Sequence, residues 1–229
     1  MIKRPSPNHD PRPDGGPVDM LVLHYTGMRD GSSAIDRLCD PAAKVSAHYA
    51  IEEDGTVFAL VDESERAWHA GIASWRGHND INARSVGIEL VNPGHEFGYR
   101  KFTEAQMAAL ADLVPDILAR HPIPRRNVVG HSDVAPERKE DPGELFDWAW
   151  LANRGIGAWP DADTHITAPA SPREITAMLE KWGYAVAGEP TKALIAFQRH
   201  FRATKLDGVA DAETTSRLWA LLKKFDHAG

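Results

Sequence analysis

The sequence has one cysteine, Cys39, so no disulfide can form within the chain. It also has no run of 18 uncharged apolar residues, which excludes a membrane-spanning helix of the usual length. Positive charge is scarce, because 26 lysines and arginines stand against 33 aspartates and glutamates, for a formal net charge of −7. A general nucleic-acid or membrane-surface binder needs a positive field, so both classes are disfavoured. What the chain does have is 11 histidines and 7 tryptophans in 229 residues of ordinary globular composition.

Composition divides the chain into four segments. Residues 1–17 hold five prolines and little that is apolar, which predicts an extended N-terminal arm and does not match a cleaved secretory signal. We therefore expect a cytoplasmic protein. Residues 18–160 have the size of a main domain, and residues 161–170 are small and polar, as in a linker. Residues 171–229 have roughly the minimal size of a unit that folds alone.

Residues 18–160 alternate between strand-like and helix-like patterns. Short apolar runs bounded by turn residues predict strands at residues 20–23, 47–51, 56–61, 86–91 and 127–130. Asp54 and Gly55 between the second and third runs predict a hairpin. Thr103 and Gln106 have the spacing of a capping box at the start of a helix. Together these signals predict an α/β fold in which a mixed central β-sheet is flanked by helices.

The C-terminal segment has the pattern of a small all-α unit of three helices. Ser171 and Glu174 flank a proline as in a capping box, and Gly183 ends the first helix. The apolar faces of the three helices are formed by Ile175, Met178, Leu179 and Trp182, by Leu194, Phe197 and Phe201, and by Leu218, Leu221, Leu222 and Phe225. No catalytic constellation is visible in this segment.

Three residues have the chemistry of a metal site. His24 and His131 each follow a predicted strand directly, where loops meet a sheet, and Asp141 lies ten residues beyond His131. Two neutral imidazoles and one carboxylate are suitable protein ligands for an open zinc site, with the fourth position left for water or substrate. The alternative is that both histidines are hydrogen-bonded residues at strand ends and that Asp141 caps the turn before Pro142. Spacing alone leaves both interpretations open.

Glu89 and Lys139 are candidates for catalytic groups. Glu89 lies in a predicted strand that is apolar on both faces, and burying a carboxylate costs several kcal/mol unless it is paired or neutralised. Enzymes accept such a cost to place a general base; the alternative is an edge strand with Glu89 in solvent. Lys139 lies two residues before Asp141, where its ammonium would stabilise negative charge on a reacting oxygen, although in this charged run it also fits a solvated surface.

Five short motifs resemble those of a known family, in the same order along the chain. They are LHYT at residues 23–26, SAHY at 46–49, AWHAG at 67–71, SVGIE at 85–89, and GHSDVAP at 130–136, the last followed by RK at 138–139 and DPG at 141–143. The chain resembles the zinc-dependent N-acetylmuramoyl-L-alanine amidases of the AmpD/AmiD type, whose fold is related to that of phage T7-lysozyme-like amidases and peptidoglycan recognition proteins. The tail, with AFQ at 196–198 and LDGV at 206–209, resembles a three-helix peptidoglycan-binding module.

The resemblance implies a role for each motif residue. It implies one zinc ion per chain held by His24, His131 and Asp141, with Glu89 as the general base and Lys139 as the partner of the oxyanion. The candidates for substrate contacts are Lys44, Trp68, His69 and Asn82. The implied substrate is the amide between the lactyl group of N-acetylmuramic acid, intact or 1,6-anhydro, and the L-alanine of the stem peptide. We expect a monomer that binds peptidoglycan or muropeptides and no nucleic acid.

Two other functions remain open at this stage. The same fold serves in non-catalytic peptidoglycan-recognition modules, which lack a ligand or the base. A different zinc hydrolase, such as an esterase or a deacetylase acting on sugars, would keep these residues and differ in its cleft.

Overall fold

The computed structural model describes residues 1–13, 16–161, 168–186 and 190–225. Six strands form one mixed sheet in the order β1-β5-β4-β7-β3-β8. Their bounds are β1 (Ile2–Lys3), β3 (Met20–Tyr25), β4 (Tyr49–Ile51), β5 (Val57–Ala59), β7 (Ser85–Leu90) and β8 (Val128–Gly130). β4 and β5 form the predicted antiparallel hairpin, and the other neighbours in the sheet run parallel. The predicted α/β class with a mixed sheet is confirmed.

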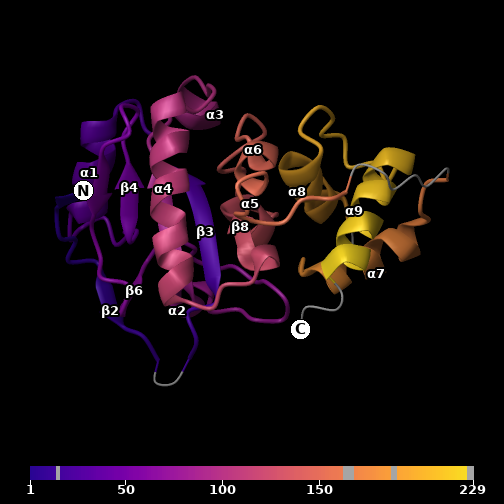
Figure 1. Ribbon diagram of the computed structural model, residues 1–229, viewed down its shortest axis with the longest axis horizontal. Helices are drawn as coiled ribbons and strands as arrows, with labels where there is room; N and C mark the ends of the chain where they lie inside the picture. The colour runs from indigo at the N-terminus through magenta and orange to yellow at the C-terminus, as the bar shows by residue number, and fades with distance from the viewer. Residues whose placement is uncertain (14–15, 162–167, 187–189, 226–229) are drawn as a thin grey trace.

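Helices surround this sheet (Figure 1). The longest, α4 (Glu104–Arg120), begins at the predicted capping box, in which Thr103 and Gln106 bind each other's backbone N–H groups. The shorter helices of this part are α1 (Gly31–Cys39), α2 (Ile81–Arg84), α3 (Gly94–Phe97), α5 (His131–Val134), α6 (Trp148–Ala152) and the 3₁₀ turn η1 (Arg125–Asn127). Among the described residues, no helix combines the length and the apolar character needed to cross a bilayer.

Successive side chains of β3 point alternately to the hydrophobic core on one face of the sheet and to the candidate site on the other. Leu21 and Leu23 join the hydrophobic cluster that contains the buried face of α4. Successive side chains of a strand point to opposite faces, so Val22 and His24 lie on the face away from α4. Glu89 of β7 pairs in register with His24 and therefore shares that face. β7 lies between β4 and β3, so the alternative of an edge strand for Glu89 is wrong.

The N-terminal arm lies along both sheets of the molecule. Its first strand, β1, extends the large sheet beside β5, and β2 (His9–Pro11) pairs antiparallel with β6 (Glu65–Ala67) in a two-stranded sheet. The guanidinium of Arg12 holds the end of the arm in place. This group donates hydrogen bonds of 2.8–3.1 Å to the backbone carbonyls of Glu63, Asn82, Ala83 and Ser85.

The C-terminal segment forms the three expected helices, α7 (Pro172–Trp182), α8 (Thr191–Phe201) and α9 (Ala212–Phe225). Ser171 and Glu174 make the predicted capping box, and Gly183 ends α7. Figure 1 shows these helices together at one end of the molecule, next to α5 and α6. Most of the predicted linker, residues 162–167, lies outside the described residues.

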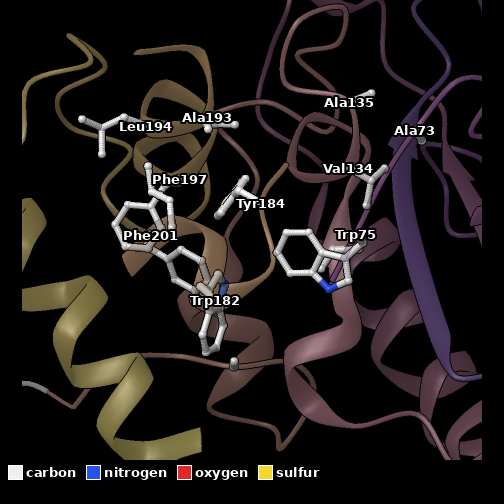
Figure 2. Packing of buried hydrophobic residues seen from close by; sticks show 14 of the residues in the cluster. Ala73, Trp75, Val134, Ala135, Trp182, Tyr184, Ala193, Leu194, Phe197 and Phe201 are labelled. Carbon is white, nitrogen blue, oxygen red and sulfur yellow. The ribbon is translucent and has the colours of Figure 1, made fainter. Parts of the chain in front are cut away.

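One hydrophobic cluster joins the C-terminal helices to the rest of the molecule. Trp75 and Val134, from the main part of the chain, belong to the same buried cluster as Tyr184 and Phe197 (Figure 2). The rings of Trp75 and Tyr184 meet edge to face, with their centroids 5.1 Å apart. The backbone of Gly183 packs so closely on Trp75 that an added Cβ would lie 2.8 Å from the indole. The two parts therefore share one core.

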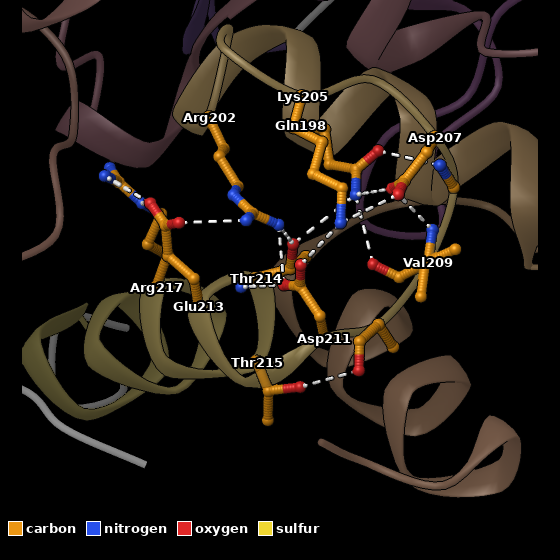
Figure 3. A network of polar contacts seen from close by, with 12 residues as sticks. Gln198, Arg202, Lys205, Asp207, Val209, Asp211, Glu213, Thr214, Thr215 and Arg217 are labelled. Carbon is orange, nitrogen blue, oxygen red and sulfur yellow. Dashed lines mark hydrogen bonds and ion pairs between the residues drawn. The ribbon is translucent and has the colours of Figure 1, made fainter. Parts of the chain in front are cut away.

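The motif that resembles a peptidoglycan-binding module has a structural role here (Figure 3). The side chain of Gln198 on α8 bonds Asp207, the N–H of Gly208 and the carbonyl of Val209, which fixes the turn between α8 and α9. Arg202 donates to Asp211 at 2.6 Å and so ties the end of α8 to the start of α9. These side chains are engaged within the protein, so the motif describes how the segment folds.

Candidate metal centre and active site

Three atoms from distant parts of the sequence converge at the carboxyl ends of β3 and β8. Nδ1 of His24 lies 3.0 Å from Nδ1 of His131 and 3.0 Å from Oδ2 of Asp141, and the last two atoms are 3.1 Å apart. All three residues are buried. Tetrahedral zinc with bonds of about 2.0–2.1 Å needs ligand atoms about 3.3 Å apart, so this donor set fits a zinc ion.

The hydrogen bonds of His131 fix which nitrogen faces the other two ligands. Its Nε2 lies 3.0 Å from the carbonyl oxygen of Ala70, which only accepts hydrogen bonds. Nε2 therefore carries the proton, and Nδ1 of the neutral ring presents a lone pair to Asp141 and His24. Such outer partners set the tautomer and the orientation of metal-binding imidazoles.

His24 is fixed in the same way through a relay of three hydrogen bonds. Ser85 Oγ donates to the carbonyl of Ile81 at 2.7 Å, so it accepts from Nε2 of His69 at 3.0 Å. Nδ1 of His69 is then an acceptor, and it takes the proton of His24 Nε2 at 3.0 Å. This leaves the Nδ1 lone pair of His24 free for a metal ion.

A glycine makes room for this relay. The ring of His69 lies against Gly87 of β7, and a Cβ at that position would lie 2.5 Å from Cγ of His69. Gly87 also donates its N–H to Nδ1 of His48 at 2.9 Å, so His48 is engaged in holding β7. His48 therefore has a structural role in this fold.

Burial keeps His24 in the protonation state that binds metal. Burial, reinforced by His131, lowers the pKa of His24 to about 4, so its imidazole is neutral at pH 7. The site thus places the neutral imidazole of His24 beside the imidazole of His131 and the carboxylate of Asp141.

Glu89 lies beside His24 on the neighbouring strand, and one oxygen of its carboxyl group lacks a hydrogen-bond partner among the described residues. Its Oε2 is buried and finds no hydrogen-bond partner among the described residues. Burial, with a smaller contribution from Asp141, raises the pKa of Glu89 to about 8, while Lys139 lowers it. A carboxyl group with a pKa near neutrality suits proton transfer in both directions.

A cleft of about 420 Å³ opens over these residues. Glu89, His131, Lys139 and Asp141 line it, so the half-buried Lys139 shares one cavity with Glu89 and with two of the candidate ligands. The chain therefore brings the predicted ligands, base and cation together in one place.

The four candidates for substrate contacts occupy different places. Trp68 and His69 line the cleft, whereas Lys44 and Asn82 are not among the residues that line it. The side-chain oxygen of Asn82 accepts the N–H groups of His69 and Ala70, so it shapes the loop that carries Trp68 and His69. Both ring nitrogens of His69 are engaged in the relay, which assigns it a positioning role that the sequence did not reveal.

The arrangement indicates a class of site, because a His-His-Asp cluster with a glutamate on the same face of a mixed sheet could hold a metal ion of the kind that hydrolases use. A family model described as N-acetylmuramoyl-L-alanine amidase matches residues 14–144. The chain belongs to this family.

Particular relatives cover nearly the whole chain. N-acetylmuramoyl-L-alanine amidase AmiD of Escherichia coli is 41% identical over 91% of this chain and 83% of its own length. The solved complex of that protein with anhydro-N-acetylmuramic acid-L-Ala-D-γ-Glu-L-Lys superposes with a TM-score of 0.84, covering 97% of this chain and 93% of the other. AmpDh3 of Pseudomonas aeruginosa, in complex with anhydromuramic pentapeptide, gives a TM-score of 0.85 at 33% identity, covering 93% and 95% of the two chains.

The smaller relatives match the main part of the chain. 1,6-Anhydro-N-acetylmuramyl-L-alanine amidase AmpD of Citrobacter freundii is 38% identical over 63% of this chain and 84% of its own length. The superpositions with AmiD and AmpDh3 cover nearly all of this chain and nearly all of the other two chains, so they include the C-terminal helices.

Proposed function

We propose that this chain is a zinc-dependent amidase that hydrolyses the amide between the lactyl group of N-acetylmuramic acid, intact or 1,6-anhydro, and the L-alanine of the stem peptide. The observation that carries the proposal is the pairing of Glu89 with His24 across β7 and β3, which places a carboxyl beside the donor cluster. AmiD and AmpD are named as amidases of this bond, and AmiD and AmpDh3 are solved with anhydromuramyl peptides, so these relatives supply the substrate class.

A zinc ion held by His24, His131 and Asp141 would supply Lewis acidity, which polarises a carbonyl oxygen and makes water a better nucleophile. Glu89 takes a proton from the attacking water and passes it to the departing amine. Lys139, on the wall of the same cleft, offers its ammonium to the oxygen that gains negative charge.

Two features favour catalysis over recognition alone. The donor cluster retains all three candidate ligands, and the buried Oε2 of Glu89 has no partner in the described protein, an unfavourable arrangement that binding alone would not require. We therefore prefer the amidase to the non-catalytic recognition module. Product analysis separates it from an esterase or a sugar deacetylase with the same ligands.

The test offers the purified protein, loaded with zinc, both an anhydromuramyl peptide and intact sacculi, with mass spectrometry of the products. We expect free stem peptide that begins with L-alanine. Glu89→Gln should lose at least about a thousandfold in turnover, within the range of general-base catalysis, and keep its zinc. His131→Ala should lose zinc and activity together, and Glu104→Gln, which changes an exposed glutamate of α4, should retain both. Wild-type rates in Glu89→Gln would remove Glu89 from the mechanism.

Three further expectations belong to this proposal. Residues 18–160 form the catalytic domain and residues 171–229 a peptidoglycan-binding-like unit, the protein acts as a monomer, and it works in the cytoplasm. Sedimentation of the purified chain tests the second expectation, and fractionation of the producing cells tests the third.

A further inference from the structure

Helix α5 carries one candidate ligand and holds another. This single turn begins with His131, directly after β8. The backbone N–H of Ser132 donates to the carbonyl of Asp141 at 2.9 Å. The position of α5 therefore determines where His131 lies and, through Ser132, where the Asp141 loop lies.

A buried carboxylate on α5 fixes that position. Asp133 is 1% exposed and accepts three hydrogen bonds. The N–H of Gly130 donates at 2.7 Å, the hydroxyl of Tyr184 at 2.6 Å and Nδ1 of His200 at 2.7 Å. Two of the three donors thus come from the C-terminal segment. A buried carboxylate that loses its donors is strongly destabilised, so α5 keeps this place only while Tyr184 and His200 remain bound.

The same face of the C-terminal segment reaches the Asp141 loop. Arg199, next to His200 on α8, lies 3.5 Å from Oε1 of Glu140 and 3.8 Å from Oε2 of Glu144. Glu140 directly precedes Asp141 in the chain. The imidazole of His200 is itself held by stacking on Trp148, with ring centroids 3.7 Å apart. Adjacent residues of α8 therefore contact the carriers of two candidate ligands.

We propose that Tyr184 and α8 brace the metal centre, so that the C-terminal segment is a positioning part of the active site in addition to any role in binding peptidoglycan. Tyr184 and His200 are positioning residues that act on His131 through Asp133. The inference rests on the proposed metal centre formed by His24, His131 and Asp141.

The experiment measures the dissociation constant of Zn²⁺ by competition with a chromophoric chelator, in the full-length protein and well below its melting temperature. Tyr184→Phe removes one hydroxyl and keeps the ring against Trp75. His200→Phe removes the donor and keeps a flat ring against Trp148, and His200→Asn restores an amide donor near the position of Nδ1. We expect Tyr184→Phe and His200→Phe each to weaken zinc binding about tenfold, as outer partners of metal sites do, and His200→Asn to recover part of the loss.

Thr214→Val is the matched control. Thr214 is buried in the C-terminal segment and bonds Arg202 and Gln198, but makes no hydrogen bond to α5. We expect it to lower the melting temperature and leave the zinc affinity unchanged. Unchanged affinity in Tyr184→Phe and His200→Phe, or an equal loss in Thr214→Val, would overturn the brace. Tyr184→Phe alone decides the question if His200→Phe does not fold. A wild-type protein that binds no zinc would instead overturn the metal centre, and the brace with it.

Discussion

Glu89 shows what the site demands of a single residue. Its carboxyl sits in a central strand without a hydrogen-bond partner for Oε2 among the described residues, and burial raises its pKa to about 8. In the unfolded chain the pKa returns to about 4.5, so between these two values the folded metal-free protein holds a proton that the unfolded protein has released. This group therefore makes the metal-free protein less stable as pH rises from about 5 to about 8.

Glu89→Gln removes this pH dependence, because glutamine does not ionise. We expect the metal-free variant to gain stability relative to the wild type by up to about 1.4 kcal/mol for each pH unit in this interval, and to match it near pH 5. Thermal unfolding followed by circular dichroism in the presence of a chelator measures the difference. The lowered pKa of His24 adds the opposite slope at lower pH, but equally in both proteins. Parallel stability curves across the interval would contradict the burial of this carboxyl.

Lys139 is expected to act on the transition state. Lys139→Met keeps a long apolar side chain in the cleft and removes the charge, so kcat should fall roughly 100- to 1,000-fold with a small change in KM. The loss of the ammonium should also raise the pKa of Glu89, since Lys139 lowers it. Steady-state kinetics over a range of pH measures both effects, and an unchanged kcat would exclude Lys139 from the chemistry.

At the residue scale, the sequence identified the candidate metal ligands that directly follow strands. It did not identify the residues that hold those ligands in position. His24 and His131 were identifiable because each ends an apolar run. The positioning role of His69 was not, since it depends on the space above Gly87 and on Ser85, sixteen residues along the chain. The same holds for Asp133, whose partners Tyr184 and His200 lie far away in sequence.

At the scale of elements, strand β7 contributes side chains both to the hydrophobic core and to the candidate site. Its residues face the core in one direction, while Gly87 and Glu89 face the site in the other. Gly87 is needed there because the ring of His69 occupies the space of a side chain.

Gly87→Ala should therefore disturb the metal site from within the strand. The added methyl group would push His69 away from His24, and we expect zinc affinity to fall about 10- to 100-fold, with a loss of about 1–3 kcal/mol in stability from overpacking. Gly16→Ala is the control, because its methyl group would meet the carbonyl oxygen of Pro13 at 3.7 Å, an ordinary contact. Chelator competition and thermal unfolding measure the two quantities. Wild-type zinc affinity in Gly87→Ala would show that the relay does not hold His24.

Element prediction succeeded where the signals are local. The hairpin at Gly55 and the capping boxes at Thr103 and Ser171 depend on neighbouring residues, and all three are present. The strands β1, β2 and β6 have two or three residues each, too few for a periodic pattern, and exist through pairing with distant partners. Local sequence does not encode that pairing.

On the scale of the whole molecule, the C-terminal helices are part of the same core as the sheet. Trp75 and Val134 lie in loops or short turns, so no helical or strand period marked them as a docking surface. The sequence predicted the three C-terminal helices. It did not predict that they pack on Trp75 and Val134 of the main part of the chain.

The shared core predicts cooperative unfolding. Calorimetry of the full chain should show one transition, and a variant that ends at residue 160 should melt at a lower temperature, because Trp75 loses its cover. Exposing a large buried apolar side chain costs about 1.5–3 kcal/mol. The truncated variant should also bind a hydrophobic dye. Two well-separated transitions in the full chain would contradict a common core.

The N-terminal arm has a consequence for the order in which the protein assembles. The carbonyls that receive Arg12 belong to residues between Glu63 and Ser85, and the partner of β1 is β5. During synthesis these acceptors leave the ribosome long after the arm itself. Strand β1 must therefore wait, unpaired, until β5 has been made, and Arg12 lacks its full set of acceptors until Ser85 has followed.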